Sequence, residues 1–195
     1  MKKHIRKLLY FIAFALMIGA FIYLGAKDYS TEEDRVSDSE AFAEQYNLVP
    51  KDNVFTIKKI ADIKTILENG NAIVFIGDSS SIWAQHYAKL LYELSLENDL
   101  DEIVYYDITK DKMQRSKSYT DLLDMLVEGV YTVDRYEKEL FTPCLYFIKN
   151  GEVIAFDNTT AMISANTTPE KYWDSYNTYT FKERIAEYIQ YYREK

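Results

Sequence analysis

The sequence predicts an α/β domain in which a central mixed sheet has helices on both faces. Short, continuously apolar segments rich in β-branched residues alternate with longer segments whose apolar residues recur at helical spacing. The dipeptide Asn150-Gly151 joins two of the apolar segments and is typical of a two-residue β-hairpin. Strand–helix–strand units that are followed by a hairpin and a closing helix predict a sheet that is parallel first and antiparallel at its end.

The first half of the chain is predicted to alternate strands and helices after an acidic tether. Ser37-Asp-Ser-Glu40 has capping-box spacing, which predicts a short helix through about Tyr46 that ends before Pro50. Strands are expected at Val54–Ile57, Ala72–Ile76 and Ile103–Tyr106. The helices between them are indicated by two apolar stripes: Ile60, Ile63, Ile66 and Leu67, then Trp83, Tyr87, Leu90, Leu91 and Leu94.

The second half is predicted to contain a polar loop, an inserted helix, the hairpin and a final helix. The loop covers 108–117, and Leu122, Leu123, Met125 and Leu126 indicate the inserted helix before Pro143. The hairpin strands are expected at Cys144–Ile148 and Glu152–Phe156, followed by a Thr/Asn-rich loop at 157–178. Thr180-Phe-Lys-Glu183 is a second capping box, and Ile185, Tyr188, Ile189 and Tyr192 make the last helix amphipathic.

The N-terminal segment predicts attachment to a membrane. Leu8–Gly25 is an uncharged run of 18 residues, which as a helix spans about 27 Å, close to the ~30 Å of a bilayer core. Basic residues precede it and acidic residues follow it, so the positive-inside rule places the N-terminus in the cytoplasm and the rest outside. The predicted organisation is a basic tail and transmembrane anchor at 1–26, an acidic tether with a short helix at 27–49, and a domain at 50–195. The alternative is a cleaved signal peptide and a secreted domain.

Charge and cysteine content exclude several functions. The formal net charge is −8, and five basic residues fall within 1–27, so the remainder carries 18 basic against 31 acidic residues. A domain this acidic is not expected to bind nucleic acid or an anionic surface by charge. The single cysteine, Cys144, allows neither an intramolecular disulfide nor a multi-cysteine zinc site, and the two histidines, His4 and His86, lie far apart. No metal or cofactor is predicted.

Three segments carry a resemblance to a known family. Val74–Asp78 is a strand that runs into a loop, Ser79–Gln85 begins an amphipathic helix, and Thr142–Glu152 combines a proline, an apolar strand and a Lys-Asn-Gly turn. Over residues 50–195 the chain resembles the thioredoxin superfamily, and more closely the bacteriocin transport accessory proteins. The resemblance implies a thioredoxin-like sheet, a Cys-x-x-Cys motif at the start of the helix, and a cis bond before Pro143.

The two redox cysteines of that family are absent. By the resemblance they would stand at Ser81 and Ala84, so dithiol–disulfide exchange by this chain alone is excluded. Ser81 as a nucleophile would need a base. His86, five residues further on, would point about 140° away around the helix. The alternative for Ser81 is helix capping, since serine is a good N-cap, and Trp83 is interpreted either as a core residue or as an exposed contact.

Two adjacent features remain as functional candidates. The resemblance implies that the backbone before Pro143 is free to pair with an extended peptide, although Thr142-Pro143 could also be purely structural. Cys144 is either a small buried apolar residue or a lone reactive thiol. The first hypothesis is therefore a non-enzymatic, membrane-anchored accessory factor for polypeptide export or folding. It would bind a polypeptide or a membrane protein through Ser81, Trp83, Thr142 and Pro143. The second hypothesis is a single-cysteine redox protein that acts through Cys144.

Overall fold

The secondary structure alternates between strands and helices throughout the part of the chain that the structure describes. The structure, a computed structural model, describes residues 32–133, 137–163 and 166–195. Its elements in chain order are α2 (Glu32–Gln45), β1 (Phe55–Ile57), α3 (Ile60–Asn69), β2 (Ala72–Gly77), α4 (Ile82–Glu97), β3 (Ile103–Asp107), α5 (Thr109–Gln114), α6 (Lys117–Met125), β4 (Val130–Thr132), β5 (Lys138–Leu140), β6 (Cys144–Lys149), β7 (Glu152–Asp157), α7 (Pro169–Tyr172) and α8 (Ser175–Glu194).

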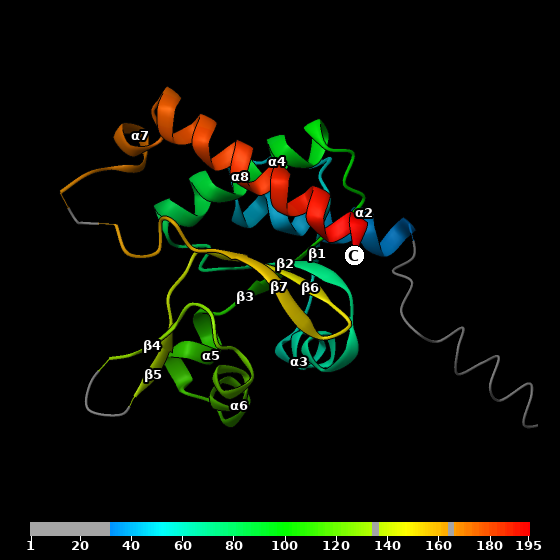
Figure 1. The fold of residues 1–195 in the computed structure, drawn as a ribbon, viewed down its shortest axis with the longest axis vertical. Coiled ribbons are helices and arrows are strands. Elements are labelled where there is room, and N and C mark those ends of the chain that lie inside the picture. The colour runs from blue at the N-terminus through cyan, green and yellow to red at the C-terminus, as the bar shows by residue number, and fades with distance from the viewer. Residues whose placement is uncertain (1–31, 134–136, 164–165) are drawn as a thin grey trace, which may run out of the picture. The chain divides into compact units, whose positions relative to one another are not determined.

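Five strands form the central sheet in the order β1-β3-β2-β6-β7. β1, β3 and β2 run parallel, whereas β6 is antiparallel to β2 and β7 is antiparallel to β6. Helices cover both faces of this sheet (Figure 1). The predicted α/β class, with a mixed sheet between two helical layers, is therefore confirmed.

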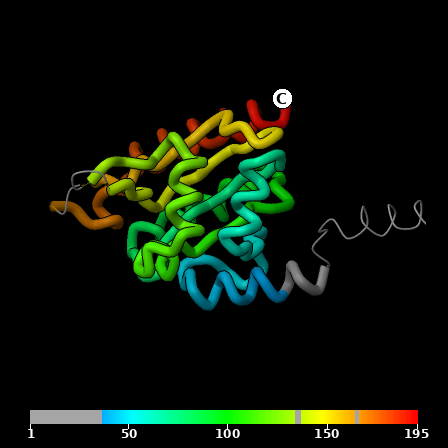
Figure 2. The backbone as a smooth tube through the Cα atoms, turned by 90° about the horizontal axis from the view of Figure 1, so that it is seen from below, coloured from blue at the N-terminus to red at the C-terminus, as the bar shows by residue number. Residues whose placement is uncertain are grey.

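One face of the sheet packs against α2, α4 and α8. Ile73 and Phe75 of β2 contribute to this core because alternate residues of a strand point to the same side. Figure 2 shows α2 near the β1 side of the sheet and α8 near the β7 side. The helical side chains buried here are Phe42, Tyr46, Ala84, Tyr87, Ala88, Leu90, Leu91, Leu94, Phe181, Ile185 and Ile189.

The opposite face packs against α3 and α6. The other residues of β2, Val74 and Ile76, point into this second core. Both faces of β2 are thus buried, which explains why its sequence is continuously apolar rather than alternating. The helical side chains buried in the second core are Ile63, Leu67, Tyr119, Leu122 and Leu123.

The predicted hairpin is present and has the expected backbone. Asn150 and Gly151 have φ values of 52° and 79°. Both lie in the left-handed region that a type I′ turn requires, and Asn-Gly tolerates this conformation better than other pairs. The turn connects β6 to β7 at the end of the sheet opposite to the one where α4 begins, so it has no part in the candidate site.

The helix α2 begins within the segment 27–37 that the sequence predicted as a tether, ahead of the short helix that was expected through about Tyr46. α2 begins at Glu32, so Ser37 lies inside the helix rather than at its start. Phe42 and Tyr46 are fully buried, and the Phe42 ring stacks on Phe55 with 3.9 Å between centroids. The compact folded unit therefore comprises Arg35–Lys195.

Short elements replace several predicted loops. α5 and the first turn of α6 occupy the polar segment 108–117, β4 pairs with β5 before Pro143, and α7 lies in the predicted loop 157–178. α8 starts at Ser175 because Asp174 caps it, with its carboxylate accepting a hydrogen bond from the N–H of Asn177 at 2.8 Å. The predicted capping box at Thr180 lies inside this helix, where the Thr180 hydroxyl donates to the Tyr176 carbonyl.

The predicted membrane anchor at 8–25 lies outside the described residues. Within the described parts of the chain, no helix has the length and apolar character needed to cross a bilayer.

Candidate functional site

Several connecting segments converge at one edge of the central sheet. Because β2 and β3 are parallel while β6 is antiparallel to them, the carboxyl ends of β2, β3 and β7 lie at the same edge as the start of β6. This edge, called here the loop edge, carries the loop before α4, the helix α5, the β4–β5 insertion and the segment with α7 (Figure 1). Ligands of open α/β sheets commonly bind at such an edge.

Ser81 caps helix α4 at the loop edge. Its hydroxyl accepts a hydrogen bond from the Ala84 N–H at 3.4 Å, which confirms the predicted capping role. Ala84 itself is fully buried. The His86 imidazole lies 3.4 Å from the carboxylate of Glu170 in α7, and no hydrogen bond joins it to Ser81 within the described residues. The geometry therefore provides no nucleophile–base pair.

The neighbouring side chains of α4 differ in exposure. Trp83 is half-buried and lies outside both cores, with its ring edge-on to Tyr172 of α7 at 5.7 Å. Ile82, at the first position of the helix, is 53% exposed. The predicted stripe of α4 therefore holds for Tyr87, Leu90, Leu91 and Leu94, whereas Trp83 packs against a segment that the sequence predicted as loop.

The peptide bond between Thr142 and Pro143 is cis, as the family resemblance implies. Pro143 is buried and Thr142 is half-buried. The Phe141 N–H donates to the Gly129 carbonyl at 3.1 Å, and Cys144 pairs with Ile76 in the sheet. Between them, neither the N–H nor the C=O of Thr142 makes a backbone hydrogen bond to another described residue. Among the described residues, the backbone hydrogen bonding at the loop edge is thus interrupted at Thr142.

Cys144 follows Pro143 but points into the core. The side chain is 0% exposed, and its Sγ lies 3.8 Å from the Ile76 carbonyl oxygen. Burial raises the pKa of the Cys144 thiol well above its usual value, which keeps it protonated at neutral pH. These surroundings favour the interpretation as a small buried residue over that of a reactive thiol.

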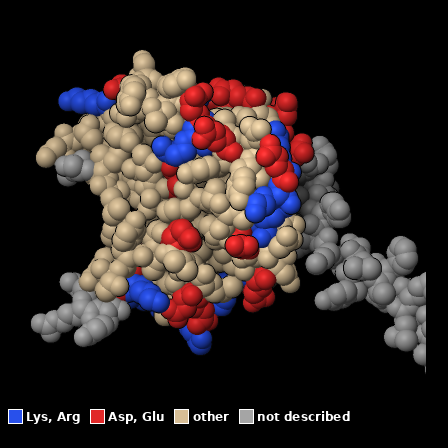
Figure 3. All heavy atoms as spheres, in the orientation of Figure 1, with Lys and Arg blue, Asp and Glu red and all other residues tan. Residues whose placement is uncertain are grey.

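Aromatic and apolar side chains surround the loop edge. Tyr131 of β4 stacks on Phe141 with 4.9 Å between ring centroids, and its hydroxyl lies 3.5 Å from the Asn158 side-chain amide. Tyr131 is 36% exposed, and Met162 is 57% exposed. Figure 3 shows the outline of the molecule hollowed between the α7 segment and the β4–β5 hairpin, where most of the visible atoms belong to neither acidic nor basic residues.

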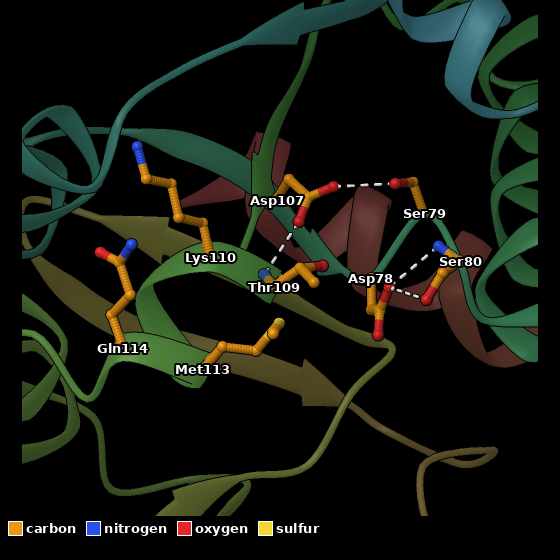
Figure 4. Close-up of a pocket in the computed structure, with 8 residues that line it drawn as sticks. All are labelled: Asp78, Ser79, Ser80, Asp107, Thr109, Lys110, Met113 and Gln114. Atoms are coloured by element: carbon orange, nitrogen blue, oxygen red, sulfur yellow. Dashed lines mark hydrogen bonds between the residues drawn. The ribbon is translucent and has the colours of Figure 1, made fainter.

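A second feature of the loop edge is a hollow of about 480 Å³ between the end of β2 and α5, called here the Asp78 hollow. Asp78 directly follows β2, and Asp107 is the last residue of the adjacent parallel strand β3. Both carboxylates face this region (Figure 4). The hollow is lined by Asp78, Ser79, Ser80, Asp107, Thr109, Lys110, Met113 and Gln114.

Hydrogen bonds fix the two carboxylates to different degrees. Asp107 accepts from the Ser79 hydroxyl at 3.0 Å, from the Thr109 N–H at 2.8 Å and from the Tyr105 hydroxyl at 3.1 Å. One oxygen of Asp78 accepts from both the N–H and the hydroxyl of Ser80. Partial burial raises the pKa of Asp78, but the hydrogen bonds from Ser80, together with the Thr109 hydroxyl and the charge of Lys112, lower the pKa overall. Asp78 is therefore ionised at neutral pH.

Buried hydroxyl groups connect the hollow to the end of the N-terminal helix α2. The hydroxyl of Tyr46, which directly follows α2, donates to the Tyr105 hydroxyl at 3.1 Å, and Tyr105 donates in turn to Asp107. Burial raises the pKa of both phenols, so both remain neutral hydrogen-bond donors. α2 is thus connected to the loop edge through buried polar groups.

Neither a family model nor a curated protein matches this chain. Within the described residues, no three His, Cys, Asp or Glu side chains are grouped as metal ligands. The interpretation of the site therefore depends on its geometry alone.

Proposed function

We propose that the protein is a membrane-anchored, extracytoplasmic binding protein of the thioredoxin-like class that holds an extended polypeptide without redox chemistry. The mixed sheet between two helical layers and the cis bond before Pro143 agree with that class. The segment 8–25 would attach the chain to the membrane. By the sequence resemblance, the role would be that of an accessory factor for polypeptide export or folding, as in bacteriocin transport.

The observation that carries the proposal is the main chain of Thr142, which makes no backbone hydrogen bond to another residue that the structure describes. A free N–H and C=O at a sheet edge can pair with an incoming extended chain, which adds as a further short strand. Hydrogen bonds on either side of this residue, at Phe141 and Cys144, hold the backbone in place. Thr142 therefore offers a donor and an acceptor that require no rearrangement before binding.

The surroundings of Thr142 suit binding rather than catalysis. The exposed side chains of Ile82 and Tyr131 and the half-buried Trp83 provide apolar contact area along the same edge. Ser81 is engaged in capping α4, and Cys144 is enclosed. The same surface would serve a free polypeptide or an extended segment of a membrane protein.

A pair of peptides with identical side chains tests this proposal. We expect the full chain in detergent micelles to bind a fluorescein-labelled nine-residue peptide of alternating valine and serine, measured by fluorescence anisotropy. N-methylation of the peptide amides that pair with Thr142 removes donors and adds bulk, so methylation at one set of alternate positions should abolish binding. Methylation at the other set should leave binding nearly unchanged, because those amides point away from the protein.

Two results would contradict the proposal. Equal binding of both methylated peptides and their parent would show that main-chain pairing is not used. Reduction of insulin disulfides by the purified chain would show a redox activity that the proposal excludes.

A further inference from the structure

The Asp78 hollow adjoins the proposed peptide site. The last residue pair between β2 and β6 is Ile76 with Cys144. Asp78 lies two residues after Ile76, and Thr142 lies two residues before Cys144. Because the two strands are antiparallel, Asp78 and Thr142 reach the same level of the loop edge. A polypeptide paired with Thr142 would therefore pass beside the hollow, and one of its side chains would face the hollow's lining.

The polar lining of the hollow has acceptor capacity to spare. Both hydrogen bonds from Ser80 go to one oxygen of Asp78, and the Thr109 hydroxyl lies near enough to lower the pKa of this carboxyl. Asp107, in contrast, accepts three hydrogen bonds from neighbouring residues. A carboxylate offers about four acceptor sites, so an incoming donor would find a vacant acceptor site at Asp78.

The local cations do not neutralise the hollow. Figure 4 shows the Lys110 side chain directed away from Asp78 and Asp107. Lys112, on the same helix, forms an ion pair with Glu139 at 2.6 Å and so joins α5 to β5. Lys110 is therefore directed away, whereas Lys112, although paired with Glu139, still acts on Asp78 and lowers its pKa. With two carboxylates against this partly paired cation, the excess charge in the hollow is negative.

The remaining wall is apolar and exposed. The Met113 side chain is 81% exposed and lies on the side of the hollow formed by α5. A methionine side chain adapts its shape to an aliphatic partner. A long aliphatic stem that ends in a positive charge matches this combination, because its stem would cover Met113 while its head reached Asp78.

We infer that the Asp78 hollow is the pocket for a lysine or arginine side chain of the polypeptide that pairs with Thr142. This inference rests on the proposed function and specifies its ligand as an extended chain with a basic residue near the pairing point. An anionic side chain would face the carboxylates of Asp78 and Asp107, and it would be disfavoured.

Peptide binding by the full chain in detergent micelles tests the pocket. The probes are labelled nine-residue peptides of valine and serine that carry lysine, norleucine or glutamate at one position, which is moved along the peptide. We expect lysine to bind about threefold to fivefold more tightly than norleucine at the position beside the hollow, as for an exposed ion pair. Glutamate should bind more weakly than norleucine there.

Three variants make the test specific. Asp78→Asn keeps an oxygen that accepts from Ser80 but removes the charge, and it should abolish the preference for lysine. Asp78→Glu should retain it. Asp124→Asn is the matched control because it also removes one negative charge, from an exposed carboxylate that pairs with Lys138, and it should leave the preference unchanged.

The outcomes separate the two proposals. Equal binding of lysine and norleucine peptides at every position would overturn the pocket assignment and leave polypeptide binding intact. The pocket assignment would fail equally if Asp78→Asn and Asp124→Asn reduced the preference to the same extent. Absence of binding by all the peptides would overturn both proposals.

Discussion

Two aspartates at the loop edge have contrasting surroundings. Asp157, the last residue of β7, is 4% exposed and accepts hydrogen bonds from the Tyr87 hydroxyl at 2.8 Å and from the Arg184 guanidinium at 2.7 and 3.0 Å. The Thr159 hydroxyl adds another at 2.7 Å. Asp78, which follows β2, is half-buried, and one of its oxygens is bonded only to Ser80.

This difference shows that the position of an acidic residue in the fold does not by itself determine its role. The enclosed carboxylate of Asp157 joins β7, α4 and α8, so its charge is used within the fold. The carboxylate of Asp78 is held from one side and open on the other. We therefore expect substitutions in the enclosed region to change stability, and substitutions at Asp78 to change binding.

The largest expected effect is on the rate at which the buried thiol of Cys144 is modified. Cys144 is fully buried, so we expect iodoacetamide to modify the native chain on the order of a thousandfold more slowly than the unfolded chain, since reaction requires opening of the core. Mass spectrometry of samples labelled with and without guanidinium measures the two rates. Comparable rates would show an accessible thiol and would favour the single-cysteine redox hypothesis.

Asp157→Ala should reduce the free energy of unfolding by about 3 kcal/mol. The substitution leaves Arg184 without its carboxylate partner and leaves the buried Tyr87 hydroxyl without an acceptor, and breaking such a pair is costly. Urea denaturation measures the change. Asp124→Ala, at an exposed ion pair, should cost less than about 0.5 kcal/mol. Similar losses for the two variants would contradict the distinction between enclosed and exposed carboxylates.

Tyr105→Phe tests the buried connection between α2 and the Asp78 hollow. Removing one hydroxyl deletes a donor to Asp107 and an acceptor for Tyr46, so we expect a loss of about 1–2 kcal/mol in unfolding free energy. Tyr176→Phe is the matched control because Tyr176 is 74% exposed, and it should change stability very little. An unchanged stability for Tyr105→Phe would show that these hydrogen bonds do not hold α2 in place.

Asp78→Asn should have the smallest effect on stability, within about 0.5 kcal/mol in urea denaturation. The asparagine oxygen can still accept the hydrogen bonds from Ser80. A loss above about 1.5 kcal/mol would place Asp78 with Asp157 as a structural residue and would remove the contrast between them.

Local sequence patterns were sufficient to predict the central sheet and its cores. The continuous apolar run of β2 and the Asn150-Gly151 turn are signals that neighbouring residues carry by themselves. The helix through about Tyr46 was expected, but its start at Glu32 was not, because the acidic residues before Ser37 resemble a solvated linker. The four-residue spacing of Phe42 and Tyr46 was the available signal that one side of this helix is buried.

The short elements were missed because contacts distant in sequence stabilise them. The Tyr119 hydroxyl of α6 accepts a hydrogen bond from the Leu140 N–H of β5, and Lys112 pairs with Glu139. Neither contact follows from local periodicity. Short helices and strands of this kind have little propensity of their own.

The candidate site was predicted in part. Ser81 as a cap was expected because capping depends on a few consecutive residues, and the cis bond before Pro143 was expected from the family resemblance. The Asp78 hollow was not, because it forms only when β2 and β3 lie side by side and bring Asp78 near Asp107. The available signal was an aspartate at the end of each of two strands joined by a helix, a pattern that places both at one edge.

The central claim is that the main chain of Thr142 pairs with an extended polypeptide, and amide hydrogen exchange at this residue tests it most directly. The N–H of Thr142 has no backbone partner among the described residues, so we expect it to exchange rapidly in the free chain. Saturating valine–serine peptide that carries the lysine should slow its exchange at least tenfold. The amide of Lys138, on the adjacent strand β5, should change little. Binding of the peptide without protection of Thr142 would contradict the account.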